Sequence, residues 1–495
     1  MTRTLVAVDL GAQSGRVAVG RFDGERLHVE EVHRFPTVAV REQGRLRWDV
    51  RRLYADVLDG LRAAARAAGP VDAVGVDSWA IDFGLLDRSG ELLANPVHYR
   101  DERRAAAMPA ALEAVPAREL YGRTGIQLLP INTVFELAAL AADGDPTLAA
   151  AETLLLIPDL VHFWLCGVRA CERTNASTTQ CWDPFAGAWA VDLLARLDVR
   201  SEILPDVVPP ATPLAPLAEE VGLGRPTVVA GATHDTAAAV AAVPFRRPDS
   251  AYVSAGTWSL VGIEAQQPAV DDATFAANVT NESGLAGTVR VLKNVTGLWL
   301  LEESRRAWAR DGHDATVDEL VAEAASAPAL RSLVDPDDSR FAGTNDAAGP
   351  LPDRVREACA ETGQPVPEEP SEVVRCLLES LALKHGATLD VLAAATGSAP
   401  TEVHVVGGGA RNALLCRWTA EAAGLPVLCG PAEATLAGNL LAQALALGEL
   451  GSLDEGREVV RRSFAPAVHE PTGAPEWSEA RARFAELFAP QGVAA

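Results

Sequence analysis

The chain has 495 residues, 48% of them hydrophobic and 22% charged, and its formal net charge is −24. This length exceeds what one hydrophobic core normally serves, so two or more domains are expected. The acidic balance argues against nucleic acid and anionic membrane surfaces as partners, because both need a basic face. A nucleotide stays possible, since backbone N–H groups and Mg²⁺ can hold its phosphates locally.

Lysine usage excludes two classes of nucleotide-binding protein. Only two lysines occur, Lys293 and Lys384, and neither follows Gly or precedes Ser or Thr. A Walker A loop needs Gly-Lys-Ser/Thr and is therefore absent. Tyr99-Arg-Asp101 resembles the His-Arg-Asp of protein kinases, but no Val-Ala-Ile-Lys strand accompanies it. If this protein uses ATP, it must do so on another fold.

Cysteine usage and apolar runs predict a soluble cytoplasmic protein. The seven cysteines are odd in number and form no CxxC motif, which favours free thiols and no zinc site. Cys359 and Cys376 fall in neighbouring predicted helices, and we still expect free thiols there. Leu5 to Val8 is too short for the apolar part of a signal peptide, and no run of about 18 apolar residues could span a membrane.

The first predicted element is a hairpin. Thr4 to Asp9 is apolar and β-branched, which predicts a buried strand, and Arg16 to Phe22 predicts a second one. The turn between them is bounded by glycines, rich in N–H groups, and carries the Ser14 hydroxyl. One interpretation is an ordinary hairpin with a solvated Asp9. The other is a phosphate cradle with Asp9 beneath it for Mg²⁺.

Residues 48–196 predict a mainly helical stretch around one further strand. Asp49 is the expected N-cap of a helix over 48–68, and Val71 to Asp77 is the expected strand. Residues 175–180 are predicted as a polar loop. Edge strands are expected at 84–86 and 97–99, and helices at 105–124, 133–143, 158–166 and 190–196.

The chain is organised around the stretch VVAGATHDTAAAV, from Val228 to Val240. Pro226 to Ala230 predicts a strand, Gly231 allows a sharp turn, and the Ala-rich run from Asp235 predicts a helix. Asp235 at this helix start could be a plain N-cap. The alternative is a catalytic base, since open α/β sheets bind ligands where strands end and helices begin.

A second hairpin suggests a duplicated fold. Val243 to Ser250 is the best candidate linker, because it combines two prolines, two arginines and two polar residues. Ala251 to Gly262 then repeats the pattern of the first hairpin: strand, Gly-Thr turn, strand. The predicted domains are residues 1–244 and 251–495.

The C-terminal half continues with a strand at 287–293 and a helix from Asn294 to Arg310. Thr401 to Val406 predicts a strand that runs into Gly407-Gly-Gly409, where a flat group could lie on the backbone. A dinucleotide site is disfavoured, because Asn412 stands where the third glycine of GxGxxG belongs and no acid ends the next strand. Helices are expected at 316–326, 352–363, 371–395, 413–423, 434–448, 453–463 and 477–488.

Six motifs together resemble the FGGY family of carbohydrate kinases, over residues 4 to about 450. They are Asp9-Leu-Gly-Ala-Gln-Ser-Gly-Arg16, His234-Asp-Thr-Ala-Ala-Ala-Val240, Gly256-Thr-Trp-Ser-Leu260, Leu292-Lys-Asn294, Gly297-Leu-Trp-Leu-Leu301 and Gly407-Gly-Gly-Ala410. The resemblance implies a two-domain α/β fold of the actin-like ATPase (ribonuclease H-like) type with an inter-domain cleft. It implies sugar and phosphate sites in the first domain, a nucleotide site in the second, and ATP and Mg²⁺ as cofactors.

The resemblance also implies roles for individual residues. Asp235 matches the family's catalytic aspartate, and Asp9 matches the acid that helps place Mg²⁺. The implied sugar contacts are Ala80, His234, Asp235, Thr236 and Asn294. The implied ATP contacts are Ala12, Gln13, Ser14, Gly15, Arg16, Thr257, Glu302 and Gly408. This chain has Ala80 and Glu302 where the family pattern has Gly and Gln.

Three further motifs indicate a branch of the family. Gly75-Val-Asp-Ser-Trp79, Tyr99-Arg-Asp101 and Asn278-Val-Thr-Asn-Glu282 resemble the branch that phosphorylates L-rhamnulose at the 1-hydroxyl in rhamnose catabolism. Trp79 could offer an apolar face to the methyl group of that sugar, or be a core tryptophan. Another ketose or polyol, such as fuculose or xylulose, is the alternative substrate, and a non-catalytic sugar sensor is the alternative class. We expect a monomer or homodimer that binds neither nucleic acid nor membrane.

Overall fold

The computed structural model describes residues 2–341 and 349–488, which form two compact units. Unit 1 comprises Met1–Pro244, Glu264–Val291 and Ala434–Phe464; unit 2 comprises Phe245–Ile263, Leu292–Glu433 and Ala465–Ala495. The chain first passes from one unit to the other inside the linker that the sequence predicted. These compact units differ from the predicted functional domains, because segments 264–291 and 434–464 follow residue 251 in the chain and yet belong to unit 1.

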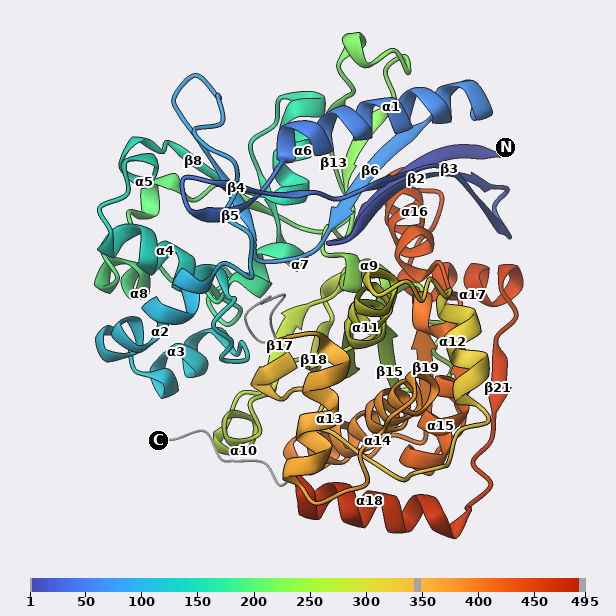
Figure 1. Cartoon of the computed structure of the whole chain (residues 1–495). Coiled ribbons are helices and arrows are strands. Elements are labelled where there is room, and N and C mark those ends of the chain that lie inside the picture. Colours follow the sequence, from blue (N-terminus) through green and yellow to red (C-terminus); the bar gives the residue numbers. More distant parts are fainter. Residues whose placement is uncertain (1, 342–348, 489–495) are drawn as a thin grey trace. The chain divides into compact units, whose positions relative to one another are not determined.

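Unit 1 is built on a six-stranded sheet of order β13-β14-β6-β1-β2-β3 (Figure 1). Its strands are β1 (Arg3–Leu10), β2 (Ser14–Phe22), β3 (Leu27–Pro36), β6 (Ala73–Ser78), β13 (Thr212–Pro216) and β14 (Thr227–Ala230). β1 is antiparallel to β2 and parallel to β6, which is in turn parallel to β14. The carboxyl ends of β1, β6 and β14 therefore share one edge of the sheet.

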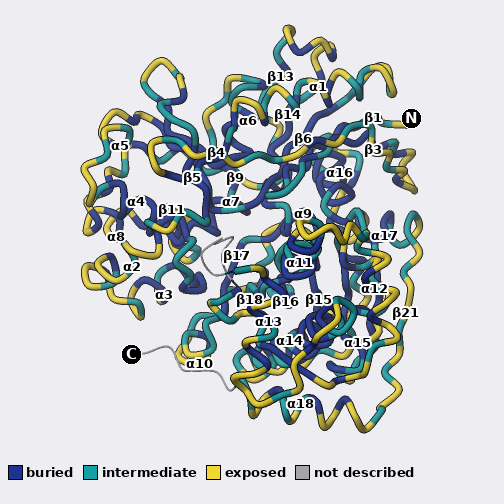
Figure 2. The backbone as a smooth tube through the Cα atoms, in the orientation of Figure 1, coloured by how far each residue is buried: buried dark blue, intermediate teal, exposed yellow. Residues whose placement is uncertain are grey.

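Helices cover both faces of this sheet. α1 (Val50–Ala68), capped by Asp49, packs so closely on β2 that a Cβ added at Gly60 would overlap Val17. α16 (Ala434–Ala446) packs on β2 from the opposite face, where a Cβ added at Gly20 would overlap Leu440. Figure 2 shows the inner strands β1, β2, β6 and β14 as mostly buried, whereas the edge strands β3 and β13 are more exposed.

The remaining elements of unit 1 are short strands and helices. The strands form the pairs β4 (Ala39–Glu42) with β5 (Arg45–Trp48), β7 (Phe83–Leu86) with β8 (Thr153–Leu156), β9 (Cys171–Glu172) with β12 (Val207–Val208), and β10 (Trp182–Asp183) with β11 (Ala188–Trp189). The helices are α2 (Glu102–Ala114), α3 (Ala117–Thr124), α4 (Thr133–Ala142), α5 (Pro146–Ala150), α6 (Ile157–Cys166), α7 (Arg173–Ala176), α8 (Val191–Arg196), α9 (Asp235–Ala241), α10 (Asp272–Ala276) and α17 (Leu453–Ser463).

Unit 2 is built on a second sheet, whose order is β17-β18-β16-β15-β19-β20-β21. Its strands are β15 (Ser250–Ala255), β16 (Trp258–Ala265), β18 (Val289–Thr296), β19 (Glu402–Val406), β20 (Val427–Cys429) and β21 (Ala467–His469), together with β17 (Thr280–Ser283), which falls in the segment Glu264–Val291 of unit 1. Its helices are α11 (Trp299–Arg310), α12 (Val317–Ala324), α13 (Leu351–Glu361), α14 (Pro370–Thr396), α15 (Ala413–Ala423) and α18 (Pro475–Leu487). The apolar core of unit 2 gathers around α14, which is buried along most of its length.

Most predicted elements are confirmed, and four predictions are wrong. The single helix predicted over 105–124 is two helices, α2 and α3, separated by Val115 and Pro116. Residues 175–180 are not a polar loop but the end of α7 and a buried 3₁₀ turn, Ser177–Thr179, in which hydroxyls cap backbone carbonyls. Residues 97–99 form only an isolated bridge from Arg47 to Val97. Asn294 does not begin a helix; it continues β18, and α11 begins at Trp299.

Two sequence expectations about the whole chain can be compared with the structure. All seven cysteines, including Cys359 and Cys376, are free thiols. Within residues 2–341 and 349–488, no helix combines the length and the apolar character that a membrane span requires.

Candidate active site

Three carboxylates meet at the strand-end edge of the unit 1 sheet. Asp9 and Asp77 are direct partners across the parallel strands β1 and β6. Asp235 is the first residue of α9, and the bridge between Ser78 and His234 joins its loop to the end of β6. The sequence predicted Asp9 and Asp235 at this edge. Asp77 completes the group and was not predicted as a site residue.

The loop before Asp235 is held by a buried acid, Glu172. Its carboxylate accepts hydrogen bonds from the backbone N–H of Thr233 at 2.9 Å and from the Thr233 hydroxyl at 3.0 Å, and also from the N–H and hydroxyl of Thr174. The Thr233 carbonyl in turn accepts from the Ser78 N–H at 2.9 Å. With so many bonds the loop has little freedom, and the position of Asp235 is correspondingly fixed.

Helix α9 is held in place by α16. A Cβ added at Gly438 would overlap the carbonyl of Ala238, so the two helices can approach this closely only because residue 438 is glycine. The next residue, Asn439, donates to Asp77 at 2.5 Å and accepts from Gln443 at 2.7 Å. One helix therefore supports both Asp235 and Asp77.

The electrostatics of the three carboxylates differ. Asp235 is the first residue of α9, and the N-cap position is held by His234 without a side-chain capping bond. The Oδ1 of Asp235 accepts from the Thr236 hydroxyl at 3.0 Å, and the Asp235 side chain is 30% exposed. Partial desolvation and the charge of Asp9 raise the pKa of Asp235 to about 7. Burial, with repulsion from Asp9 and Asp235, raises the pKa of Asp77 well above its usual range. Asp9 is instead paired with Arg16 at 2.6 Å.

The predicted phosphate turn is tied back at its carbonyl groups. Thr37 donates its hydroxyl to the Gly11 carbonyl at 2.7 Å and its N–H to the Gln13 carbonyl at 3.1 Å. Among the described residues, Gln13 Nε2 is a buried donor without a hydrogen-bond partner. A turn whose acceptors are engaged and which holds a spare donor suits an anion such as a phosphate.

On the predicted sugar side, Ala80 lies in a strained turn. The Asp82 N–H donates to the Ala80 carbonyl at 2.9 Å, which makes a γ-turn, and Ile81 between them has φ of 70°. Positive φ is unusual for a β-branched residue, and such strain persists only where neighbours enforce it. Here the Ile81 carbonyl accepts from the Thr133 hydroxyl at 2.6 Å, and Asp82 is anchored through its side chain.

Asp82 is structural, because its carboxylate is saturated by protein donors. It accepts from the indole N–H of Trp48 at 2.6 Å and of Trp79 at 3.0 Å, from the Tyr99 N–H at 3.2 Å, and from Arg104 at 2.6 Å. Trp79 packs against Trp48 with ring centroids 4.4 Å apart and is only 6% exposed. Trp79 therefore lies in the environment of a core tryptophan, as one of its two sequence interpretations stated.

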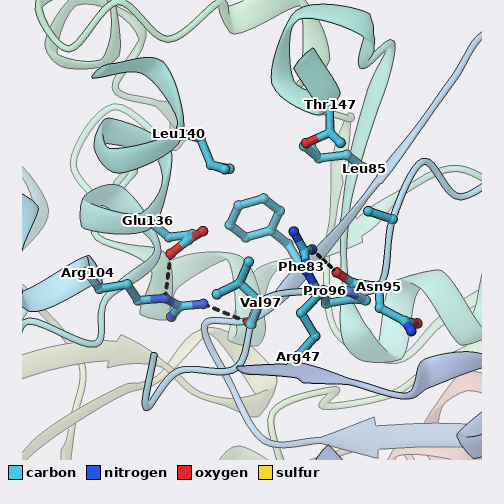
Figure 3. Close-up of a pocket in the computed structure, with 11 residues that line it drawn as sticks. Arg47, Phe83, Leu85, Asn95, Pro96, Val97, Arg104, Glu136, Leu140 and Thr147 are labelled. Atoms are coloured by element: carbon cyan, nitrogen blue, oxygen red, sulfur yellow. Dashed lines mark hydrogen bonds and ion pairs between the residues drawn. The ribbon is translucent and has the colours of Figure 1, made fainter. Parts of the chain in front are cut away.

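A pocket opens beside this network, and Figure 3 shows Arg104 between Glu136 and the Val97 carbonyl at its edge. Apolar side chains such as Phe83 form much of its lining. The charge of Arg104 is already shared between Asp82 and Glu136. The lining includes none of the predicted sugar contacts, so we do not assign the pocket to the sugar.

In unit 2, Thr257 and Gly408 lie on neighbouring glycine turns. The Thr257 carbonyl accepts from the Gly297 N–H at 3.2 Å, and a Cβ added at Gly409 would lie 2.5 Å from that of Ala255. Gly408 itself faces open space. These close backbones leave a surface on which a flat group such as a nucleotide base could lie.

The other two site residues predicted in unit 2 lie on β18 and α11. Glu302 lies in the first turn of α11 and is paired with Arg305 at 2.8 Å and Arg306 at 3.3 Å, so its negative charge is compensated. Asn294 is part of β18 and is partly exposed.

Sequence reasoning missed several residues that shape the site. Asp77 carried the same signal as Asp9, an acid that ends a buried strand, and could have been found that way. Glu172 and Arg290 gave no local signal, because only the fold brings them near Asp235. Glu282 was noted only as part of a branch motif and not as a site residue. No group of three or more His, Cys, Asp and Glu side chains in residues 2–341 and 349–488 is arranged to hold a metal ion.

Comparison with known proteins identifies the family. The model of the FGGY carbohydrate kinase N-terminal domain matches residues 4–242, and that of the C-terminal domain matches residues 251–447. The chain therefore belongs to the FGGY family of carbohydrate kinases. It is a carbohydrate kinase, and the family expected from the motifs is confirmed.

Relatives of named activity cover nearly the whole chain. A protein of Bacteroides thetaiotaomicron named rhamnulokinase is 40% identical over 98% of this chain and 99% of its own length. Another so named, from Enterobacter sp., is 38% identical over 97% of both chains.

Solved structures match the fold at low identity. Xylulose kinase from Lactobacillus acidophilus superposes with a TM-score of 0.80 at 16% identity over 98% of both chains. Plasmodium falciparum glycerol kinase has a TM-score of 0.77 at 15% identity over 99% of both. The two-domain α/β fold that the resemblance implied is confirmed.

Proposed function

We propose that this chain transfers the γ-phosphoryl group of ATP to the 1-hydroxyl of L-rhamnulose and so takes part in rhamnose catabolism. The observation that carries the proposal is the 40% identity to a rhamnulokinase over 98% of the chain. The products are L-rhamnulose 1-phosphate and ADP. The proposal is consistent with the motifs near residues 75–79, 99–101 and 278–282.

Asp235 is the proposed general base. Phosphoryl transfer needs an oriented hydroxyl, a group that accepts its proton, and neutralised phosphate charge. A pKa near 7 lets Asp235 take a proton as the hydroxyl attacks and release it afterwards. The Thr236 hydroxyl holds one carboxylate oxygen, which orients the other toward the substrate.

The phosphates of ATP are the proposed ligands of the hairpin turn from Ala12 to Arg16. The spare donor of Gln13 and the tied-back carbonyls support this assignment. Asp9 is the proposed contact for Mg²⁺, which needs only one or two carboxylates beside its waters and the phosphates. When bound, Mg²⁺ would neutralise charge that develops on the phosphoryl group. Arg16, paired with Asp9, is suited to take part of that charge.

The nucleotide is proposed to bind unit 2 through Thr257, Glu302 and Gly408. The open face of Gly408 supports the placing of the base there. On this proposal residues 1–244 carry the sugar and phosphate work and residues 251–495 the nucleotide work.

The sugar is proposed to contact Ala80, His234, Asp235, Thr236 and Asn294. These are neutral groups apart from the base, which favours an uncharged sugar over a phosphorylated or carboxylated one. The γ-turn at Ala80 supports this assignment, because strained backbone gathers at binding sites. We further propose that the enzyme works in the cytoplasm as a monomer or homodimer, since ATP chemistry and seven free thiols suit a reducing compartment.

A coupled ADP-release assay with a panel of sugars tests the proposed substrate. A site that pairs each hydroxyl rejects wrong epimers, because each unpaired buried polar group costs about 1–3 kcal/mol. L-Rhamnulose should therefore exceed L-fuculose, L-xylulose, D-xylulose and glycerol by at least about tenfold in kcat/KM. A higher value for fuculose or xylulose would refute the substrate and leave the kinase assignment standing. If none of these sugars stimulated ADP release, the result would point instead to a sugar sensor.

A further inference from the structure

Three buried polar side chains, those of Glu282, Arg290 and His234, form a chain of contacts that ends at Asp235. Glu282 on β17 is paired with Arg290 on β18 at 3.0 Å, and the same Arg290 nitrogen, Nη2, lies 3.0 Å from Nδ1 of His234. His234 Nε2 lies 3.4 Å from Oδ1 of Asp235. The side chains of Arg290, Glu282 and His234 are 0%, 5% and 7% exposed, so water hardly competes for these contacts.

The geometry decides where the imidazole proton lies. Nδ1 of His234 lies 3.0 Å from Arg290 Nη2 and 3.5 Å from Glu282 Oε2. An arginine guanidinium only donates hydrogen bonds, so at the shorter of these two contacts Nδ1 accepts. In a neutral imidazole the single proton is then on Nε2. That N–H faces the Asp235 carboxylate and the proposed position of the sugar hydroxyl. Burial and the charge of Arg290 hold the pKa of His234 well below its usual range, which agrees with a neutral ring.

Arg290 is itself firmly oriented. Its Nε donates to the Ser283 carbonyl at 3.2 Å, and the Ser283 N–H donates to the Ser177 hydroxyl at 2.9 Å. Glu282 balances the guanidinium charge at the same nitrogen that meets His234. A paired and anchored cation next to a ring nitrogen is an arrangement that selects one tautomer.

We propose that Arg290, with Glu282 as its counter-charge, is a positioning residue that fixes His234 as the neutral Nε2–H tautomer beside the base Asp235. This inference rests on the proposed function for the identity of the base. Its structural part, the tautomer, does not depend on which sugar is phosphorylated. In this arrangement His234 donates to the carboxylate or to the sugar hydroxyl and cannot act as a competing base at Nε2.

The test is nitrogen NMR on the full chain labelled with ¹⁵N-histidine, without ATP or sugar. The signal of His234 is identified by its loss in the His234→Asn variant. We expect the parent to show the neutral ring with its proton on Nε2. A parent signal from the Nδ1–H tautomer, or from a charged imidazolium at pH 7, would overturn the proposal without any Arg290 variant.

Substitution of Arg290 supplies the second readout. Arg290→Met should abolish the single tautomer and lower kcat by about 10–100-fold, the usual range for groups that orient a functional side chain. The KM for ATP should stay within twofold. Arg290→Lys, which keeps a hydrogen-bond donor and a positive charge, should partly restore both the Nε2–H tautomer and kcat. An unchanged tautomer in Arg290→Met would overturn the proposal.

Arg457→Met is the matched control, because Arg457 is similarly buried and is paired with Glu264 at 2.9 Å in the same unit. It should lower thermal stability while leaving the His234 signal and kcat unchanged. If Arg290→Met proves too unstable, the double variant Arg290→Met/Glu282→Gln removes the uncompensated charge and restores folding. That variant should fold and still lack the Nε2–H tautomer. Retention of the tautomer there would refute the role of Arg290, whereas the sugar panel alone decides the proposed substrate.

Discussion

The two units repeat one sheet with different residues at its strand ends. The unit 1 order β3-β2-β1-β6-β14-β13 matches β18-β16-β15-β19-β20-β21 strand for strand. Each has an antiparallel hairpin, β1 with β2 and β15 with β16. Each continues with two parallel neighbours and an antiparallel edge strand. The duplication suggested by the two hairpin motifs therefore extends to six strands of each sheet, and, among the described strands, β17 has no counterpart in the first sheet.

The strand ends show what differs. In unit 1 the edge carries Asp9, Asp77 and, one loop later, Asp235. In unit 2 the corresponding strands β15, β19 and β20 are followed by Gly256, Gly407 and Gly430. The backbone is shared, and the residue types at the strand ends differ. On the proposed function, the carboxylates serve a proton and a metal ion, and the glycines allow close approach of a flat ligand.

The largest effect on the carboxylate edge of unit 1 is expected from substitution of Asp235. Asp235→Asn keeps the size of the side chain and removes the base, so turnover should fall by about 10²–10⁴-fold. ATP binding, measured by calorimetry, should stay close to that of the parent. The exposed acid Asp23 supplies the control variant Asp23→Asn, which should keep full activity. Turnover near the parent rate in Asp235→Asn would rule out the base assignment.

Substitution of Asp9 should change the dependence of activity on Mg²⁺ more than the KM for the sugar. Asp9→Ala removes the proposed Mg²⁺ contact, so the Mg²⁺ concentration for half-maximal activity should rise by at least about tenfold. The KM for the sugar should change much less. A Mg²⁺ titration with the same half-saturation point in parent and variant would contradict the assignment.

The glycine half is tested by two neighbouring substitutions. Gly408→Ala places a methyl group in open space, so thermal stability should be unchanged. The KM for ATP should rise by about tenfold, because the methyl group would crowd the nucleotide base of ATP. Gly409→Ala forces a Cβ to 2.5 Å from that of Ala255 and should lower the melting temperature instead. An unaltered KM for ATP in Gly408→Ala would remove the nucleotide assignment from this turn.

The sequence predicted most of the frame and only the local part of the site. Hairpins, the strand into α9 and the glycine turns are encoded in short stretches, which is why they were predicted within a few residues. The stretch 175–180 was misread, because its polar side chains satisfy buried backbone groups instead of meeting water.

Residues that act on the site from a distance could not be predicted. Glu172 is 61 residues from Thr233, and Arg290 is 56 residues from His234. A buried acid or arginine resembles a surface one in the sequence until the fold supplies its partner. Asp77 is the exception, since the rule that identified Asp9 applied to it equally.

The smallest expected effect is on thermal stability. It should depend on pH for a substitution at Asp235 in unit 1 and not for one at Gly408 in unit 2. The pKa of Asp235 is raised to about 7 in the folded chain, whereas an unfolded aspartate ionises near 3.9. The folded state therefore holds the proton more tightly, and stability from this group is full below pH 4 and is lost as pH rises through 7. Asp235→Asn stays neutral throughout. At pH 8, without Mg²⁺ or nucleotide, it should melt about 2–4 °C above the parent, the shift that 1 kcal/mol gives in domains of 150–250 residues. Below pH 4 the gap should close, and Gly408→Ala should show no such dependence. A gap that persists at pH 4 would mean that packing, and not the charge of Asp235, separates the two proteins.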